Sequence, residues 1–280
     1  MIDTVTIDFL IEKYDVLLFD AYGVLVDART ALPGAALLVQ RLNQHGKPYY
    51  ILSNDAAKTP QTALKRYRNF GLEIKEGAVL TSGCMLKPFF KKHGLFGAKC
   101  AVMGPEDSTL FVQQAGGEVV GFNESFEVLV VADESGYPLL ETLDQVISSL
   151  FQYIDAGGRP TLILPNPDLI YPKHGKGFGL AAGSLASMIE NVLKLRYPQS
   201  PKLHFHRLGK PYQDMFKTVM TQAGTENAVM VGDQLVTDIC GANRSGLDSA
   251  LVLSGVSRLE EISARDEACY TPTYILRDLL

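Results

Sequence analysis

The sequence predicts an α/β protein built on a doubly wound parallel sheet. The first observation is the continuous apolar run at 16–19, typical of a strand covered on both faces. The second is the segment 35–44, where apolar residues recur at helical spacing before Gly46 ends the helix. The third is the buried strand expected at 48–52. Strand, helix and strand in succession form a βαβ unit, which requires a parallel sheet.

The same alternation continues along the chain. Thr59 is the expected N-cap of a helix that starts at Pro60 and runs through Tyr67. A second α/β series begins near Thr81, with expected strands at 99–103, 128–132 and 161–164 and expected helices at 140–151 and 184–195. The glycine-rich stretch 173–183 precedes the last of these helices. From about residue 204 a third section follows, with strands at 229–232 and 250–253 and a helix at 238–245.

Composition excludes several classes of protein. The chain has 280 residues, enough for one large or two ordinary domains. A net charge of −5 argues against a nucleic-acid-binding surface, but a local cationic pocket for a small phosphorylated ligand remains compatible with it. The acidic amino terminus does not resemble a signal peptide, and no apolar run reaches the length of a membrane span. We therefore expect a cytoplasmic protein, and a homodimer is compatible with the sequence.

The four cysteines are far apart in the sequence and have no CxxC spacing. Such a pattern is typical of reduced, structural thiols in a cytoplasmic protein. We therefore expect neither a disulfide nor a metal site from Cys84, Cys100, Cys240 and Cys269.

Asp20 directly follows the first buried strand. In an open α/β sheet, ligands bind in the crevice outside the carboxyl ends of the strands, so this carboxylate is a candidate functional residue. Gly23 lets the chain turn sharply after it. The alternative is structural, because aspartate is also a common turn or helix-capping residue.

Three later residues carry charge at strand ends or helix starts. Lys210 precedes a proline at a helix start, where a lone lysine is more often exposed to solvent. Asp233 and Asp238 are five residues apart after an apolar strand and Gly232. Asp238 has the alternative role of capping the helix expected to begin there.

In combination, these residues are much more specific. Asp20, Ser53, Lys210, and the pair Asp233 and Asp238 occur in the order of the four motifs of the haloacid dehalogenase-like (HAD) superfamily, which the chain therefore resembles. Finer features resemble class IIA members such as 4-nitrophenylphosphatase, phosphoglycolate phosphatase and pyridoxal phosphatase. The segments that carry this finer resemblance are PGA at 33–35, SNDAAKTP at 53–60, NPD at 166–168, GS at 183–184, GKP at 209–211 and GDQLVTD at 232–238.

The resemblance implies an architecture. Class IIA members carry a C2-type α/β cap inserted between the second and third motifs. The corresponding division here is a HAD-like core at 1–81 and 188–280, with the cap at 82–187.

The resemblance also implies a role for each matched residue. Asp20 would attack a phosphate ester and form an aspartyl-phosphate. Mg²⁺ would be held by Asp20, the backbone carbonyl of Tyr22 and Asp233, with Asp238 acting outside the direct ligand set. Lys210 would offset negative charge at the phosphate. The implied phosphate-binding residues are Ser53, Asn54, Asp55, Lys210 and Asn166.

Tyr22 departs from the pattern of the superfamily. Phosphatases of this kind usually read DxDG, where the second aspartate protonates the leaving alcohol and then activates water, but this chain reads DAYG. A neutral tyrosine is a poor base at pH 7, so Tyr22 puts turnover at risk. We expect a phosphatase that acts on a small phosphorylated metabolite and is slowed by the change at Tyr22; a low-turnover binding or regulatory protein is the main alternative.

A haloacid dehalogenase is a further alternative, because the DAYG sequence resembles the corresponding segment of those enzymes. Their aspartate attacks carbon and needs no Mg²⁺. Asp233 and Asp238 argue against this chemistry, because a dehalogenase has no reason to keep an acidic pair beside the nucleophile. Dehalogenases also carry a helical cap after the first motif, where this chain has only a short connection.

Overall fold

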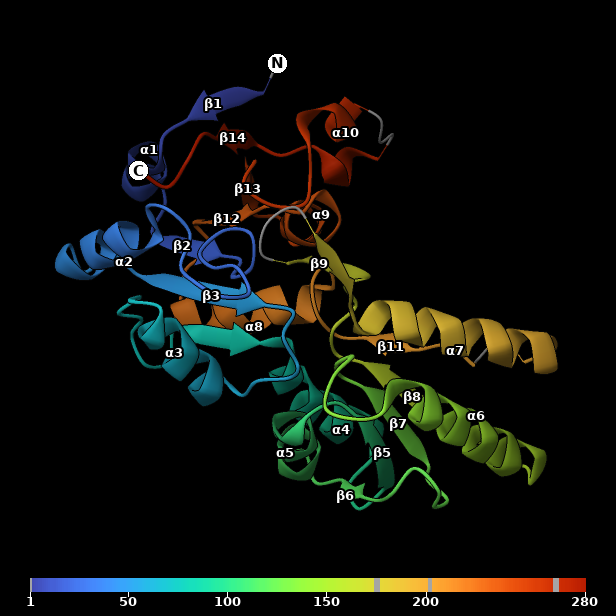
Figure 1. Ribbon diagram of the computed structural model, residues 1–280. Helices are drawn as coiled ribbons and strands as arrows, with labels where there is room; N and C mark the ends of the chain where they lie inside the picture. Colours follow the sequence, from blue (N-terminus) through green and yellow to red (C-terminus); the bar gives the residue numbers. More distant parts are fainter. Residues whose placement is uncertain (1, 174–176, 201–202, 264–266) are drawn as a thin grey trace.

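The computed structural model describes residues 2–173, 177–200, 203–263 and 267–280, and its two lobes are each built on a parallel sheet (Figure 1). The strands of the larger sheet lie in the order β1-β14-β13-β12-β2-β3-β4, and all neighbours are parallel. Their bounds are β1 (Asp3–Val5), β2 (Val16–Phe19), β3 (Tyr49–Ser53), β4 (Val79–Thr81), β12 (Ala228–Gly232), β13 (Asp248–Val252) and β14 (Tyr274–Leu276).

Helices cover both faces of this sheet because successive strand residues point to opposite sides. Leu17 and Phe19 of β2 pack in one apolar cluster with α1 (Ile7–Lys13), α2 (Ala35–Gln44) and α3 (Pro60–Asn69). Val16 and Leu18 belong to a second cluster with α8 (Gln213–Ala223) and α9 (Cys240–Arg244). The predicted doubly wound parallel sheet is therefore confirmed.

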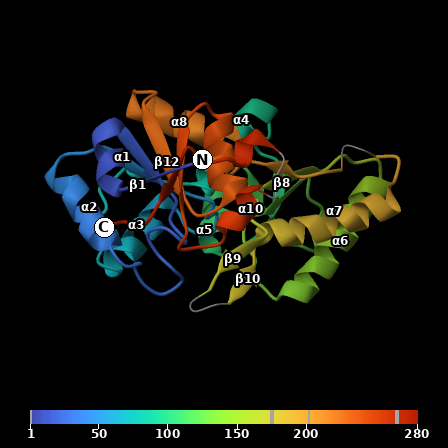
Figure 2. The ribbon, with the colours of Figure 1, turned by 90° about the horizontal axis from the view of Figure 1, so that it is seen from above.

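The smaller sheet has the strand order β11-β8-β7-β5-β6 and is also parallel. Its strands are β5 (Lys99–Met103), β6 (Glu118–Val119), β7 (Val128–Val131), β8 (Thr161–Leu164) and β11 (His206–Arg207). One face packs against α6 (Leu139–Asp155) and α7 (Ala182–Arg196), which lie on the side away from the larger sheet (Figures 1 and 2). Among the described residues, no helix is long and apolar enough to cross a membrane.

The two lobes share an apolar cluster. The other face of the smaller sheet packs with α4 (Leu86–His93) and α5 (Glu106–Gln114), in the same cluster that covers one face of β2. Thr59 adds a polar contact between the lobes, because its backbone N–H donates to the Asp107 carboxylate at 2.8 Å. As predicted, Thr59 is also the N-cap of α3 and accepts a hydrogen bond from the Thr62 N–H at 3.2 Å.

Helix α7 spans the position at which the sequence predicts the second junction between the lobes. Helix α7 runs without interruption past residue 187, and Ile189 and Leu193 pack in the same apolar cluster as the smaller sheet. Strand β11 then pairs with β8. We therefore propose that the second junction follows β11 and that the first lies near residue 81.

Two local elements also differ from expectation. The glycine-rich stretch contributes to an antiparallel hairpin, β9 (Ile170–Pro172) and β10 (Phe178–Leu180); residues 174–176 of that stretch lie outside the described residues. The helix expected at 238–245 starts earlier, as a π-helical turn, η2 (Leu235–Ile239), followed by α9. The remaining short elements are η1 (Ser82–Met85), α10 (Leu259–Ser263) and η3 (Ala268–Tyr270).

The prediction of reduced thiols is wrong for one pair of cysteines. Cys240 at the start of α9 and Cys269 in η3 form a disulfide, whereas Cys84 and Cys100 are free. The two half-cystines are 29 residues apart in the sequence. No spacing motif marks such a pair, because packing of α9 against η3 brings the sulfurs together.

Candidate active site

Three neighbouring strands of the larger sheet deliver the first site residues to one edge. Asp20 follows β2, Ser53 ends β3, and Asp233 follows β12. Strands β12 and β2 are adjacent, and the Asp20 N–H donates to the Val231 carbonyl at 2.9 Å. All three side chains are buried. The crevice expected at the carboxyl ends of the strands is therefore present.

Lys210 joins this edge from the junction between the lobes. Its Nζ donates to Asp20 Oδ1 at 2.6 Å and to Asp238 Oδ1 at 2.7 Å, and the residue is 1% exposed. Burial lowers the pKa of Lys210, but the two carboxylates more than compensate, and its pKa is raised above the ordinary value. The alternative of a solvent-exposed lysine is therefore wrong.

Asn54 holds the backbone of Lys210 in place. Its Oδ1 accepts from the Lys210 N–H at 2.7 Å, while its Nδ2 donates to the Lys210 carbonyl at 3.0 Å. The same Nδ2 donates to Asp168 Oδ1 at 2.8 Å. The side chain of Asn54 connects the strand end of the core with Lys210 and with the inserted lobe, so the phosphate contact predicted for Asn54 would use its backbone N–H.

A cluster of carboxylates surrounds the lysine. Oxygens of Asp20, Asp233 and Asp238 lie within 4.8 Å of one another. Burial raises the pKa of Asp233, and the neighbouring carboxylates raise it further. Burial likewise raises the pKa of Asp238 to about 6, while Lys210 acts in the opposite direction. Among the described residues, three carboxylates thus face one ammonium group.

The oxygens of this cluster fit a hard divalent cation. Asp233 Oδ2 accepts from the Val256 N–H at 2.7 Å, but the buried Oδ1 has no partner among the described residues. Both oxygens of Asp238 are engaged, because Oδ1 accepts from Lys210 and Oδ2 from the Gln234 N–H at 3.1 Å. Asp20 and Asp233 are therefore the residues that could bind a metal directly, and Asp238 orients Lys210.

Gly23 permits the close approach of the Asp20 turn to Asp233. Its φ is +88°, a conformation that residues with a side chain rarely adopt. A Cβ at this position would lie 2.4 Å from Asp233 Oδ2. The sharp turn expected at Gly23 is confirmed, and it brings the backbone after Asp20 against the second metal-ligand candidate.

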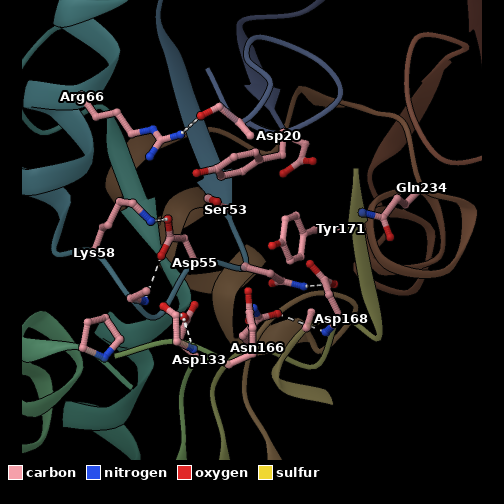
Figure 3. Close-up of a pocket in the computed structure, with 18 residues that line it drawn as sticks. Asp20, Ser53, Asp55, Lys58, Arg66, Asp133, Asn166, Asp168, Tyr171 and Gln234 are labelled. Atoms are coloured by element: carbon pink, nitrogen blue, oxygen red, sulfur yellow. Dashed lines mark hydrogen bonds and ion pairs between the residues drawn. The ribbon is translucent and has the colours of Figure 1, made fainter. Parts of the chain in front are cut away.

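A cavity of about 490 Å³ opens above these residues between the two lobes (Figure 3). Such a volume suits a small ligand. Asp20, Ser53 and Asn54 line its core end. Other residues of the larger lobe and its connections contribute Tyr22, Asp55, Lys58 and Arg66, and the inserted lobe contributes Asp133, Glu134, Asn166, Asp168 and Tyr171.

Tyr22 lies on the wall of this cavity, two residues after Asp20. Burial raises the pKa of Tyr22 above the ordinary value, so its phenol is neutral at pH 7. The guanidinium of Arg66 lies over the ring, with its Cζ 5.8 Å from the ring centroid. At the position where the phosphatases that the sequence resembles have a carboxylate, this site therefore has a neutral aromatic ring beside a cation.

The other predicted phosphate-binding residues differ in what their side chains offer. Ser53 lines the cavity with its hydroxyl. Asn166 also lines it, and its Oδ1 accepts from the Asp168 N–H at 3.1 Å. The Asp55 carboxylate accepts from the Ala57 N–H at 2.8 Å and pairs with Lys58 at 3.0 Å. Asp55 can therefore meet a phosphate only through its backbone.

Several cavity residues were not predicted as site residues, although Asp168 and Lys58 lie within the motifs at 166–168 and 53–60. Asp168 accepts the hydrogen bond from Asn54; burial raises its pKa to about 7 while that hydrogen bond lowers it. Burial, with Asp133 nearby, also raises the pKa of Glu134 to about 7. Lys58 and Arg66 come from the segment after β3. Only the fold brings these groups to one cavity.

Known proteins resemble the chain over nearly its whole length. The profile described as haloacid dehalogenase-like hydrolase matches residues 17–118, and a HAD-hydrolase-like profile matches residues 207–280. The ribonucleotide monophosphatase NagD of Escherichia coli (strain K12) is 30% identical over 258 residues, which cover 91% of this chain and 93% of that protein. The chain belongs to the haloacid dehalogenase-like hydrolases. The predicted family is therefore confirmed.

Other HAD relatives point the same way. The 4-nitrophenylphosphatase of Schizosaccharomyces pombe is 28% identical over 296 residues, covering 96% of this chain and 93% of that protein. A crystal structure of a possible sugar phosphatase of the HAD superfamily from Cytophaga hutchinsonii superposes with a TM-score of 0.84 at 28% identity. That match covers 100% of this chain and 99% of the other. These relatives place the chain in class IIA.

The carboxylate cluster leads to a prediction about metal binding. Mg²⁺ should raise the melting temperature of the parent protein, because a ligand that binds only the folded state stabilises it by about 2.7 kcal/mol at 100 times its Kd. Asp233→Asn should lose most of this shift. It should not destabilise the metal-free protein, because burial and the neighbouring carboxylates already disfavour the Asp233 charge.

Thermal unfolding with increasing Mg²⁺ measures both effects. Asp144→Asn, an exposed carboxylate on α6, is the matched control and should keep the full shift. If Mg²⁺ raised the melting temperature of Asp233→Asn as much as that of the parent, the cation would bind elsewhere.

Proposed function

We propose that this HAD-family chain is a Mg²⁺-dependent phosphatase that hydrolyses a small phosphorylated metabolite through an aspartyl-phosphate on Asp20. The observation that carries the proposal is the set of contacts of Lys210 with Asp20 and Asp238, beside an Asp233 oxygen without a partner, at the end of a ligand-sized cavity. Relatives named as phosphatases support the same reaction.

In the first step, an Asp20 carboxylate oxygen attacks phosphorus. The bond between phosphorus and the leaving oxygen breaks, and the alcohol departs after taking up a proton. Lys210 orients the carboxylate through its bond to Oδ1 and offsets the negative charge that gathers around phosphorus. The Ser53 hydroxyl would donate to a phosphoryl oxygen, since Ser53 lines the cavity beside Asp20. A bound Mg²⁺ supplies positive charge that reduces repulsion between the two anions.

In the second step, water attacks phosphorus and the bond to Asp20 breaks. The products are inorganic phosphate and the free carboxylate, and the proton lost by water must pass to a base. Tyr22 occupies the position of the usual base, but its raised pKa keeps the phenol protonated. We therefore expect slow turnover unless another group accepts this proton.

Tyr22 also supports a second candidate function. A protein that binds a phosphorylated metabolite and Mg²⁺ but turns over little would keep the Lys210 cluster and tolerate the loss of the acid/base carboxylate. General acid–base catalysis contributes about 10²–10⁴-fold. A loss of this size would leave activity detectable, while binding would become the main property.

We propose that the protein is cytoplasmic and that its ligand is the small phosphorylated metabolite. We also propose that two copies of the chain can assemble as a homodimer.

The nucleophile gives the first test of this function. Asp20→Asn should abolish release of phosphate from 4-nitrophenyl phosphate, because a neutral amide oxygen does not replace the attacking carboxylate. Asp8→Asn, at an exposed position on α1, is the control and should retain the parent rate. Equal rates in the parent and in Asp20→Asn would make Asp20 a turn residue and reject the mechanism.

Tyr22→Asp separates the two candidate functions. A carboxyl group at position 22 should protonate the leaving oxygen and activate water, so hydrolysis of an alkyl phosphate should accelerate by about 10²-fold or more. The gain should be much smaller for 4-nitrophenyl phosphate, whose phenolate leaves without protonation. Tyr22→Phe retains the ring without the hydroxyl and should show no gain.

The melting temperatures of both position-22 variants should be measured together with their rates. Tyr22 packs against the core and under Arg66, so its replacement can lower the stability of the protein. A stable Tyr22→Asp protein without a gain on any alkyl phosphate would favour the binding protein.

A further inference from the structure

Arg66 extends from α3 into the cavity and has no role in the steps described so far. Figure 3 shows its guanidinium on the same side of the cavity as Lys58. Arg66 and Ala28 also line a second, more open cavity of about 500 Å³. Arg66 and Ala28 therefore border both hollows, and Arg66 faces a ligand bound at Asp20 from the side of Tyr22.

The guanidinium of Arg66 is held in place but keeps unused hydrogen-bonding capacity. Its Nη2 donates to the Ala28 carbonyl at 2.6 Å, and its Cζ lies 5.8 Å from the Tyr22 ring centroid and 5.1 Å from that of Phe70. Its Nε is buried and has no hydrogen-bond partner among the described residues. In the described part of the chain, no carboxylate lies within ion-pair distance of it. Ala28 accepts one N–H of this guanidinium, so in the described part of the chain its charge and its other N–H groups remain for an anionic ligand in the cavity that Arg66 lines.

Lys58 provides the contrast on the same wall. Its ammonium pairs with the Asp55 carboxylate at 3.0 Å, so its charge is balanced within the protein. Among the described residues that line this wall, Arg66 is thus the cation left for a ligand.

The charge around the outer cavity has one sign. Its described lining includes Arg29, Lys65 and Arg66 and no acidic side chain. Arg29 and Lys65 are exposed, and Arg66 is half-buried. The opposite wall of the inner cavity, on the inserted lobe, carries Asp133 and Glu134. An anion is therefore attracted toward Arg66 and repelled from the inserted lobe.

We propose that Arg66 binds a second anionic group of the substrate, a carboxylate or a further phosphate, with Arg29 and Lys65 strengthening its attraction. The proposal rests on the proposed function, because the first anionic group is the phosphoryl group at Asp20. A planar guanidinium forms directed, charge-assisted hydrogen bonds with the oxygens of either group. Tyr22 follows Asp20 by two residues and its ring lies beside Arg66, so Asp20 and Arg66 are near each other in the cavity. The phosphoryl group at Asp20 and the acid group at Arg66 therefore belong to one compact molecule.

The substrate class is therefore a small phosphomonoester that also carries an acid group, rather than a neutral phosphorylated alcohol or sugar. Two pairs of probes isolate this feature. 3-Phosphoglycerate and glycerol 3-phosphate differ by a carboxylate, whereas fructose 1,6-bisphosphate and fructose 6-phosphate differ by a second phosphate.

The test compares kcat/KM within each pair, with Mg²⁺ present, for the parent, Arg66→Gln, Arg66→Lys and Arg68→Gln. Arg68 lies on the same helix, lines neither cavity and serves as the matched control. The parent should prefer the more acidic member of at least one pair. Arg66→Gln should reduce that preference by about 10- to 100-fold, as expected for loss of a charged hydrogen bond. Arg66→Lys should retain part of the preference, and Arg68→Gln all of it.

The pair that responds identifies the second group as carboxylate or phosphate. Equal kcat/KM within both pairs for the parent, or an undiminished preference in Arg66→Gln, would overturn the proposal.

Binding separates this proposal from the proposed function. Calorimetric titration of Asp20→Asn with 3-phosphoglycerate and glycerol 3-phosphate, and with the two fructose phosphates, measures the anion preference without turnover. One outcome would reject the phosphatase and keep the anion site. In it the parent hydrolyses no probe, Asp20→Asn still binds the acidic member of a pair more tightly, and the double variant Asp20→Asn, Arg66→Gln loses that preference. Hydrolysis without any such preference would reject the anion site and keep the phosphatase.

Discussion

The ammonium of Lys210, buried between the carboxylates of Asp20 and Asp238, is the interaction on which the site depends. Removing an ammonium and two carboxylates from water is costly, and their mutual attraction compensates only when the geometry is good. Here the three groups come from the end of β2, the junction after β11 and the turn η2, so the geometry exists only in the folded chain. Asn54 contributes by holding the Lys210 backbone from both sides.

The same cluster leaves an imbalance that gives the site its chemistry. One lysine does not neutralise three carboxylates, and the buried Asp233 oxygen remains without a partner. A protein selected for stability alone would have little reason to keep this arrangement, because burial and the neighbouring charges raise the pKa of Asp233. A cation and a phosphate ester would together balance these charges. Tyr22 changes proton transfer next to this cluster without removing any of its carboxylates.

Much of this arrangement was predictable because the relevant signals are local. Apolar runs followed by polar residues locate Asp20, Ser53 and Asp233 at strand ends, and a parallel sheet brings such ends to one edge. Long-range packing has no such signal. The side-chain role of Asn54, the place of Arg66 in the cavity and the Cys240–Cys269 disulfide each depend on segments that meet only after folding. The hairpin β9–β10 was missed because glycines in a short segment indicate a loop as readily as a strand.

The carboxylate cluster predicts that a divalent cation binds between Asp20 and Asp233, beside the Lys210 ion pairs. A crystal structure grown with Mn²⁺ would test this most directly, because Mn²⁺ substitutes for Mg²⁺ at oxygen sites and gives an anomalous signal. We expect an anomalous peak in contact with carboxylate oxygens of both residues, including Asp233 Oδ1. An ordered cluster without a peak at saturating Mn²⁺, or a peak bound only by other residues, would contradict it.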